Sequence, residues 1–155
     1  MAFEALKDRR EITSQDIERH GVPWCMTDEV AENIRNKPVL IVNTDLSGGP
    51  GIHWLCLFVR DNEVEIFDPL GPENKRSNWD ILLEEIRSSG MGVHIMPIRA
   101  QAKKSSHCGW FSLAAARLGP DALALVFADV NKAKSASRTA LGNVKQLIRM
   151  FGYQE

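Results

Sequence analysis

Three segments of the chain carry residue types that could perform nucleophilic catalysis together. His53 follows a glycine-rich stretch, Asp68 follows an apolar run, and Cys108 begins an apolar segment. A cysteine in the first turn of a helix lies where the helix dipole and the free backbone N–H groups favour a thiolate. A neighbouring carboxylate can accept the Nδ1 proton of an imidazole, which leaves Nε2 free as a base. We therefore expect Asp68 to orient His53 through Nδ1, and His53 to activate Cys108 through Nε2.

Each of these residues has a simpler interpretation when it is taken alone. A histidine at the start of a strand is more often structural than catalytic, and Asp68 before Pro69 is a turn signal. A cysteine that precedes Gly-Trp-Phe is more often a small core residue. His107, beside Cys108, is expected to be exposed and to point away from it. The combination of the three segments, rather than any one of them, indicates a catalytic site.

The elements that would position these side chains follow from the hydrophobic pattern. Helical periodicity predicts helices over 14–20, 28–36, 79–88, 108–118 and 138–151. The expected N-caps are Thr13, Thr27 and Asn78. Short apolar runs predict strands over 39–42, 54–60, 64–67 and 93–98. A three-residue turn over 61–63 would return Asp68 to the side of His53. The predicted fold class is α+β, with a central mixed or antiparallel sheet packed by helices in one domain over residues 1–155.

Composition narrows the class of protein. The chain has 155 residues, of which 44% are hydrophobic and 25% charged, as is typical of soluble globular domains. No apolar run approaches the roughly 18 residues that a membrane span needs, and the first residues lack the apolar core of a secretory signal. Three irregularly spaced cysteines argue against a disulfide scaffold and against a zinc site. We therefore expect an intracellular, reducing location, no metal and no membrane partner.

The net charge of −1 conceals an uneven distribution along the chain. Residues 1–96 contain 10 Lys and Arg against 17 Asp and Glu, a net charge of −7, whereas residues 97–155 contain 9 against 3, a net charge of +6. Such an asymmetry can mark a face that binds nucleic acid or another polyanion. The simpler interpretation is that these cations lie on solvated helix faces. Nucleic-acid binding through the basic half therefore stays open.

Four short motifs lie in one order within residues 38–112. They are Ile41-Val42-Asn43-Thr44, Gly51-x-His53-Trp54, Phe67-Asp68-Pro69-x-Gly71, and Gln101 followed after six residues by Cys108-Gly109-x-Phe111. This pattern resembles the adenain-like cysteine proteases, the family of the adenovirus maturation protease, which is related to the proteases that process SUMO and ubiquitin-like proteins. The resemblance implies the same protease fold and a catalytic order of His, then Asp, then Cys.

The resemblance also implies a role for each matching residue. Cys108 would be the nucleophile, His53 its base and then the acid that protonates the leaving amine, and Asp68 the group that orients the imidazole. Gln101, with the backbone N–H of Cys108, would form the oxyanion hole.

The same resemblance implies a substrate-binding cleft. Trp54 would form an aromatic wall over a narrow cleft that suits small residues before the cut. Gly109 would let the substrate backbone pass near the nucleophile, and Gly51 would allow a similarly close approach. We expect cleavage near Gly-x-Gly or Gly-Gly sequences.

The expected function is therefore a cysteine endopeptidase, encoded by a virus and used to mature capsid or core precursor proteins in the host nucleus or cytoplasm and in the virion. A processing or deconjugating protease for ubiquitin- or SUMO-like proteins is the main alternative. An acetyltransferase effector with the same triad order, and a protease-like binding module without activity, are further alternatives. No cofactor is expected, although the resemblance leaves an activating peptide or DNA open.

Overall fold

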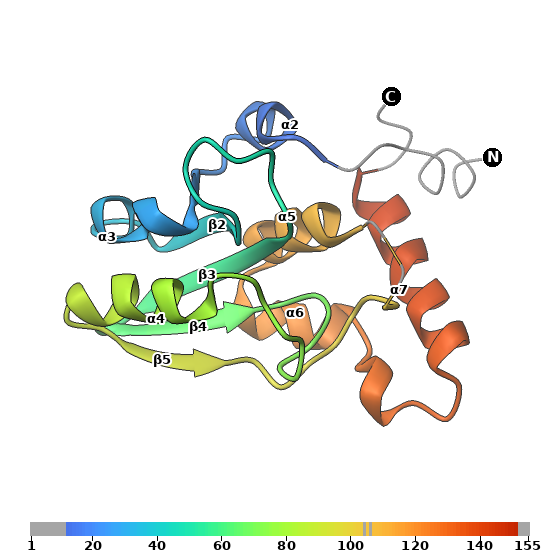
Figure 1. Cartoon of the computed structure of the whole chain (residues 1–155). Helices are drawn as coiled ribbons and strands as arrows, with labels where there is room; N and C mark the ends of the chain where they lie inside the picture. The colour runs from blue at the N-terminus through green and yellow to red at the C-terminus, as the bar shows by residue number, and fades with distance from the viewer. Residues whose placement is uncertain (1–11, 104, 106, 152–155) are drawn as a thin grey trace.

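A five-stranded mixed sheet forms the centre of the fold (Figure 1). The computed structural model describes residues 12–103, 105 and 107–151. The strands are β1 (Trp24–Met26), β2 (Val39–Asn43), β3 (Trp54–Arg60), β4 (Glu63–Phe67) and β5 (Gly92–Ile95). They lie side by side in chain order; β1 is parallel to β2, β5 is parallel to β4, and the pairs β2–β3 and β3–β4 are antiparallel. The predicted α+β class with a mixed central sheet is confirmed.

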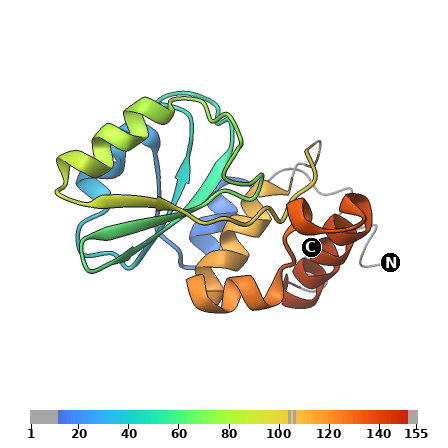
Figure 2. The same ribbon diagram turned by 90° about the horizontal axis from the view of Figure 1, so that it is seen from below.

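Helices cover both faces of this sheet (Figure 2). The short α3 (Val30–Asn33) and α4 (Trp79–Ser88) pack on one face; α5 (Cys108–Leu118), α6 (Pro120–Val126) and α7 (Ala136–Phe151) pack on the other. Side chains alternate between the faces along β3, so that Cys56 and Phe58 join the core under α5 while Leu55 and Leu57 join the core under α4. Burial on both faces explains why β3 is an almost unbroken apolar run.

The hairpin between β3 and β4 is tighter than the sequence pattern predicts. Its loop has two residues, Asp61 and Asn62, with φ of 50° and 64°. Positive φ at both positions is the geometry of a type I′ turn, which matches the twist of the strands that it joins. The resulting register pairs Cys56 with Phe67, and this brings the end of β4 back to the start of β3.

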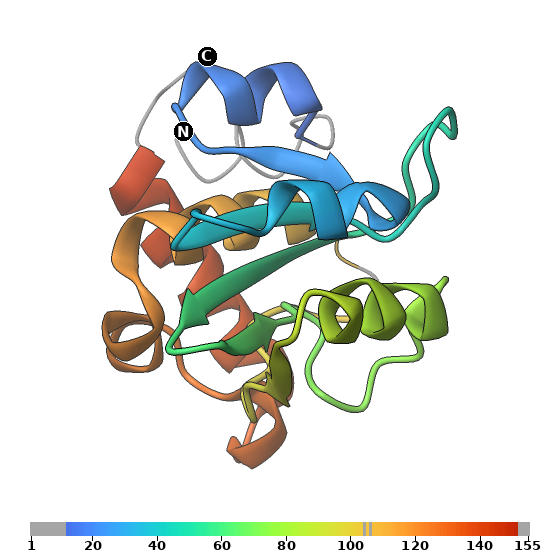
Figure 3. The same ribbon diagram turned by 90° about the vertical axis from the view of Figure 1, so that its left-hand side faces the viewer.

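Helix α2 (Ser14–Arg19) lies beside β1 at the edge of the sheet (Figures 1 and 3). The predicted cap is confirmed, because the Thr13 hydroxyl accepts from the Asp16 backbone N–H and the Asp16 carboxylate accepts from the Thr13 backbone N–H. This capping box fixes the chain just before α2, where it passes the start of α5.

The second predicted helix, over 28–36, is mostly replaced by a 3₁₀ turn, η1 (Thr27–Glu29), and the short α3. Thr27 does not cap it, because its hydroxyl donates instead to the Asn43 carbonyl at the end of β2. Asn78 is also not a side-chain cap: its amide donates to the Thr44 carbonyl while its backbone adopts a left-handed conformation. The Thr27 and Asn78 side chains therefore connect the starts of η1 and α4 to the end of β2.

The remaining helix and strand boundaries differ less from the predicted ones. Strand β5 is shorter than the predicted 93–98, α7 begins two residues before the predicted 138, and β1 and α6 were not predicted. A second 3₁₀ turn, η2 (Val130–Lys132), joins α6 to α7. No helix among the described residues is both long and apolar enough to cross a bilayer.

Candidate active site

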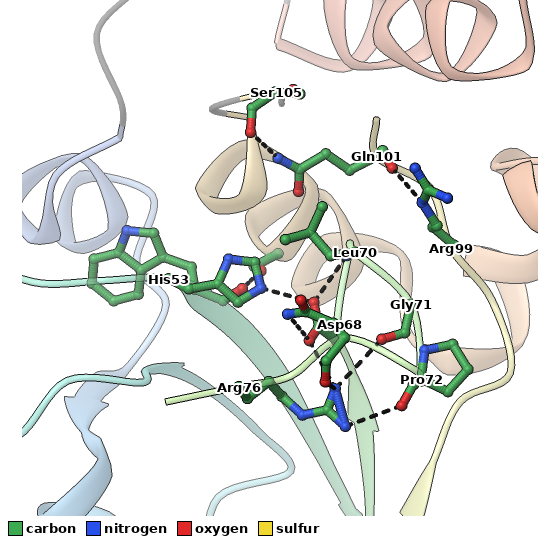
Figure 4. A network of polar contacts seen from close by, with 12 residues as sticks. His53, Asp68, Leu70, Gly71, Pro72, Arg76, Arg99, Gln101 and Ser105 are labelled. Atoms are coloured by element: carbon green, nitrogen blue, oxygen red, sulfur yellow. Dashed lines mark hydrogen bonds and ion pairs between the residues drawn. The ribbon is translucent and has the colours of Figure 1, made fainter. Parts of the chain in front are cut away.

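The three residues predicted to do chemistry meet at one end of the sheet. His53 immediately precedes β3, Asp68 immediately follows β4, and Cys108 is the first residue of α5. The His53 Nε2 lies 2.7 Å from Asp68 Oδ1 (Figure 4), and Cys108 lies close enough to His53 to act on the pKa of the imidazole. Helix α5 is held against β3 by a bond from the Ser112 hydroxyl to the Trp54 carbonyl, 3.2 Å long. The chain order His, Asp, Cys therefore becomes a contiguous group of side chains.

The orientation of the His53 ring differs from the prediction. Nε2, not Nδ1, faces the Asp68 carboxylate. The reason lies in the sheet: Asp68 extends from the neighbouring strand, so the ring nitrogen farther from the backbone reaches it. Cys108 instead lies on the helix packed against the face of β3. Nδ1 is therefore the ring nitrogen that Asp68 does not use.

Asp68 is fully buried and all of its acceptor positions are used. Oδ1 accepts from His53 Nε2 and, at 2.9 Å, from the Leu70 backbone N–H; Oδ2 accepts from Asn74 Nδ2 at 3.0 Å and from Arg76 Nη1 at 3.1 Å. A carboxylate with four donors cannot rotate without breaking several bonds. Asp68 therefore fixes the plane of the imidazole.

Arg76 is a functional candidate that the sequence pattern did not indicate. Its side chain is only 4% exposed and forms an ion pair with Asp68. The guanidinium also donates to the carbonyls of Asn74 and Pro72 at 2.8 and 3.2 Å, and it stacks over the Trp79 ring at 4.2 Å. Arg76 thus folds the loop after β4 around the Asp68 carboxylate. In the sequence it is one arginine in a polar loop, with no spacing that separates it from a surface cation.

The environment of His53 favours its protonated form. Burial lowers the pKa, but hydrogen bonds to Asp68 and Cys108, together with their charges, outweigh burial and raise the pKa to about 9. An imidazolium is therefore expected at neutral pH, and it can stabilise a thiolate beside it.

The other two cysteines lie in different surroundings. Cys25 and Cys56 are both free and buried, one in the core on each face of the sheet. Burial, with a smaller contribution from Glu29, raises the pKa of Cys25 to about 12; burial also raises the pKa of Cys56. Buried thiols of this kind are poor nucleophiles. Cys108 is also buried, with 8% of its surface exposed, but it begins a helix and lines the same cavity as His53.

Gln101 lines the same cavity as Cys108, and its side-chain amide is already partly engaged. Its side chain is buried, and Nε2 donates to the Ser105 carbonyl at 2.5 Å (Figure 4). The backbone N–H groups of Ala100 and Gln101 both donate to the Pro69 carbonyl, which ties this segment to the Asp68 loop. One N–H of the Gln101 amide is therefore committed, and the other can donate to a bound group.

We refer to the hollow that joins these groups as the polar cavity, with a volume of about 280 Å³. It is lined by Thr44, Ile52, His53, Leu70, Asn74, Lys75, Arg76, Ser77, Gln101, Ser105 and Cys108. Three of its lining side chains contain a buried polar atom with no hydrogen-bond partner among the described residues: Thr44 Oγ1, Arg76 Nε and Gln101 Oε1. Because buried polar atoms are nearly always paired, their concentration here is typical of a site that binds a polar ligand.

On the other side of Cys108 lies a second hollow of about 310 Å³, the neutral groove. It is lined by Ile12, Thr13, Ser14, Trp24, Met26, Asn43, Gly49, Pro50, Gly51, Ile52, Trp54 and Cys108. No acidic or basic side chain occurs among these described lining residues. Trp54 packs edge-on against Trp24 with 5.9 Å between ring centroids, and Gly51 has a φ of +103°. Trp54 and Gly51 thus border a hollow next to Cys108, as predicted from the resemblance.

Gly109 lies against Ile12 and Trp54. A Cβ atom on Gly109 would overlap Ile12 Cγ2 and lie 3.0 Å from Trp54 Cδ1, so the space beside the glycine is filled. The glycine allows the segment before α2 to pack against α5, and its role in letting a substrate backbone pass stays a prediction.

His107 is half-buried rather than exposed, and its Nδ1 lies 2.7 Å from the Ser105 hydroxyl. Among the described residues, no group of three or more His, Cys, Asp or Glu side chains could hold a metal ion. The chain matches no protein-family model and no curated protein, so its chemistry is interpreted from this geometry.

Proposed function

We propose that the protein is a cysteine endopeptidase with an adenain-like fold. The observation that carries this proposal is the position of His53, whose Nε2 lies 2.7 Å from Asp68 Oδ1 and which lines one cavity together with Cys108. Cys108 begins α5 and lines both the polar cavity and the neutral groove, whereas Cys25 and Cys56 line neither of them.

In the first half of the proposed reaction, the Cys108 thiolate attacks the carbonyl carbon of the scissile peptide bond and forms a C–S bond. The carbonyl electron pair moves to oxygen, where the Cys108 backbone N–H and the second Gln101 Nε2 hydrogen can stabilise it. His53 then donates its Nδ1 proton to the amide nitrogen, the C–N bond breaks, and the amine leaves. A thioester to Cys108 remains.

In the second half, a water molecule attacks the thioester carbonyl and gives a proton to His53 Nδ1. The C–S bond breaks, the carboxylic acid product leaves, and the thiolate and imidazolium are restored. Asp68 keeps the ring in position throughout, because its carboxylate is held by Leu70, Asn74 and Arg76.

The neutral groove supports a preference for small residues before the cut. Its walls are two packed tryptophans, Trp24 and Trp54, and a loop that contains Gly49 and Gly51. The loop is held close by its own polar residues, since Asn43 Oδ1 accepts from Asp45 and Ile52 and Asp45 Oδ2 accepts from Gly51. We infer that Gly-x-Gly or Gly-Gly sequences fit here, as in the maturation of viral capsid or core precursors.

The test is cleavage of peptides with Gly-x-Gly and Gly-Gly junctions, with products identified by mass spectrometry. Ubiquitin and SUMO fused to a fluorophore are assayed in parallel, and acetyl-CoA consumption is measured without peptide. Peptide cleavage that Cys108→Ala abolishes is the expected result. Cleavage of the fusions alone would point to a deconjugating protease, and acetyl-CoA consumption without cleavage would point to an acetyltransferase. Full activity of Cys108→Ala would overturn the proposal.

A further inference from the structure

A third hollow lies next to the polar cavity and differs from it in charge. We refer to it as the basic cavity; it has a volume of about 430 Å³ and is lined by Leu70, Glu73, Asn74, Lys75, Arg99, Lys103 and Asn131. Leu70, Asn74 and Lys75 also line the polar cavity, so the two hollows adjoin. The basic cavity therefore adjoins the polar cavity, and it shares no described lining residue with the neutral groove.

The charge of this cavity is not compensated within the described part of the chain. Lys75, Arg99 and Lys103 are three cations against the single carboxylate of Glu73, and none of the three forms an ion pair with a described residue. Three unpaired cations around one hollow produce a positive potential that attracts anionic groups.

Arg99 is held in place so that part of its guanidinium stays available. Nε donates to the Gln101 carbonyl at 2.9 Å (Figure 4), and Nη1 donates to Asn131 Oδ1 at 3.3 Å. Its aliphatic stem packs on Gly71, where a Cβ atom would lie 2.9 Å from Arg99 Cβ. Nη2 has no hydrogen-bond partner among the described residues. A fixed guanidinium with unused N–H groups is well suited to bind a carboxylate.

We propose that the basic cavity binds acidic side chains of the substrate on the C-terminal side of the scissile bond. This inference rests on the proposed protease function, in which the neutral groove receives the residues before the cut. A peptide in extended conformation advances at most about 3.6 Å per residue. Once it passes Cys108 and the polar cavity, its next side chains reach the basic cavity, where Asp or Glu pairs with Lys75, Arg99 and Lys103.

A substrate carboxylate explains this cavity better than a nucleic-acid backbone does. The cations surround a small hollow that adjoins the polar cavity, so a bound carboxylate would lie on the same chain as the scissile bond. Glu73 in the same lining would repel a continuous row of phosphates, whereas separate carboxylates can pair with the cations around it.

The test compares two peptides that are identical up to the cut and differ after it. One has three glutamates at the second to fourth positions after the cut, and the other has three glutamines. We expect a kcat/KM about tenfold higher for the acidic peptide, mainly through KM, with the difference reduced in high salt. Lys75→Gln/Lys103→Gln should remove this difference, so that the variant cleaves the acidic and the glutamine peptide with equal kcat/KM.

A matched control separates local from general charge effects. Lys134→Gln/Lys145→Gln removes the same two charges from exposed positions outside the cavity and should keep the preference. Binding of both peptides to Cys108→Ala, followed by fluorescence anisotropy, gives a readout without turnover and should show the same order of affinity.

Different results overturn different claims. Equal cleavage of the two peptides, or equal loss of preference in the two double variants, would overturn the acidic-substrate inference and leave the protease proposal standing. Displacement of the acidic peptide by a single-stranded oligonucleotide at lower concentration than by a free glutamate peptide would mean a nucleic-acid site. Cleavage of neither peptide by the wild-type protein would overturn the proposed function and the inference that rests on it.

Discussion

The neutral groove and the polar cavity meet at Cys108, but they are built in opposite ways. Around the neutral groove, polar groups are paired within the loop itself, since Asn43 and Asp45 accept from backbone N–H groups of residues 45–52. Around the polar cavity, charged groups are buried and several polar atoms have no partner among the described residues. The neutral groove can therefore bind a group through its shape, whereas the polar cavity can bind one through charge and unused hydrogen-bonding groups.

This difference assigns separate roles to the two sides. Substitutions at the polar cavity should change the chemical step and its pH dependence, because the charges that act on His53 come from there. Substitutions at the neutral groove should change packing and KM, because no described lining side chain apart from Cys108 can ionise there. The following changes test this division, beginning with the residue that both hollows share.

Cys108→Ala should lower kcat/KM by at least roughly 10⁴-fold, because no other thiol near either hollow can replace it. The fold should survive, since Cys108 lies at the start of α5 and the change removes one atom. Circular dichroism and a thermal scan test the fold. Cys25→Ala is the matched control and should retain most activity, because Cys25 lies in the core on the opposite face. Loss of activity in the control alone would place the nucleophile elsewhere.

His53→Ala should lower kcat/KM by roughly 10³–10⁴-fold, since it removes both the base and the cation beside the thiolate. His107→Ala should cost less than tenfold, because the Nδ1 of this ring contacts the Ser105 hydroxyl, whereas the Asp68 carboxylate contacts His53. Steady-state kinetics of the two variants on one peptide measures this difference in kcat/KM. An inactive His107 variant together with an active His53 variant would mean that the base is misassigned.

Asp68→Asn should lower kcat/KM by up to roughly 10⁴-fold, because an amide oxygen still accepts from Nε2 while the negative charge is lost. The wild-type pH profile should fall on the alkaline side near pH 9, where His53 loses its proton. Without the charge of Asp68, burial dominates the His53 pKa, so the alkaline limb should move toward neutral pH. An unchanged limb would mean that Asp68 does not control His53.

The protonation of His53 also affects the free energy of unfolding, and the sign of this effect follows from the raised pKa of His53. Protonation of His53 stabilises the folded state fully below about pH 6.5, and this contribution is lost as the pH rises through about 9. Urea unfolding at pH 6 and pH 9.5 should therefore show a larger decrease in the free energy of unfolding for wild type than for Asp68→Asn.

Arg76→Ala should lower kcat/KM by roughly tenfold and the free energy of unfolding by about 3–5 kcal/mol, because it leaves Asp68 with an unpaired buried charge. Arg76→Lys should recover part of both losses, since it keeps the charge but not the several donors. Arg87→Ala, at an exposed position of α4, is the control and should change stability by less than about 0.5 kcal/mol. Equal effects of Arg76→Ala and Arg87→Ala would mean that Arg76 has no role in the site.

The features that the sequence predicted best are those set by local patterns. Helix α5, from Cys108, and the hairpin that carries His53 and Asp68 follow from apolar periodicity and a turn signal. Strand β1 has three residues and exists because it pairs with β2, which no local pattern indicates. Helix α6 was not predicted because a proline directly after a helical segment usually indicates a stop, whereas Pro120 is the first residue of a new helix.

In the site, residue type and order predicted which side chains meet but not how they are turned. The His53 ring orientation depends on the register of β3 with β4 and on the packing of α5, both non-local. Arg76 and Asn74 reach Asp68 only because the loop after β4 folds back on itself. Gly109 was assigned to substrate binding because the sequence does not show that Ile12 fills the space beside it.

Gly109→Ala tests the neutral groove and should have the smallest effect on catalysis. The added methyl group would overlap Ile12 Cγ2, so the segment before α2 must shift, at a cost of about 1–3 kcal/mol in stability. Because Ile12 lines the neutral groove, KM should rise severalfold while kcat and the alkaline limb stay unchanged.

Gly109→Ala/Ile12→Ala provides the decisive comparison, since Ile12→Ala removes the overlapping Cγ2 and leaves only Ile12 Cβ, in a tight contact 3.0 Å from the added methyl group. The double variant should therefore lose less stability than the two single variants together, as measured by urea unfolding in a double-mutant cycle. Additive losses would mean that Gly109 does not accommodate Ile12. A shift of the alkaline limb in Gly109→Ala would mean that the two sides of Cys108 are not independent, because a packing change in the neutral groove would then have reached His53.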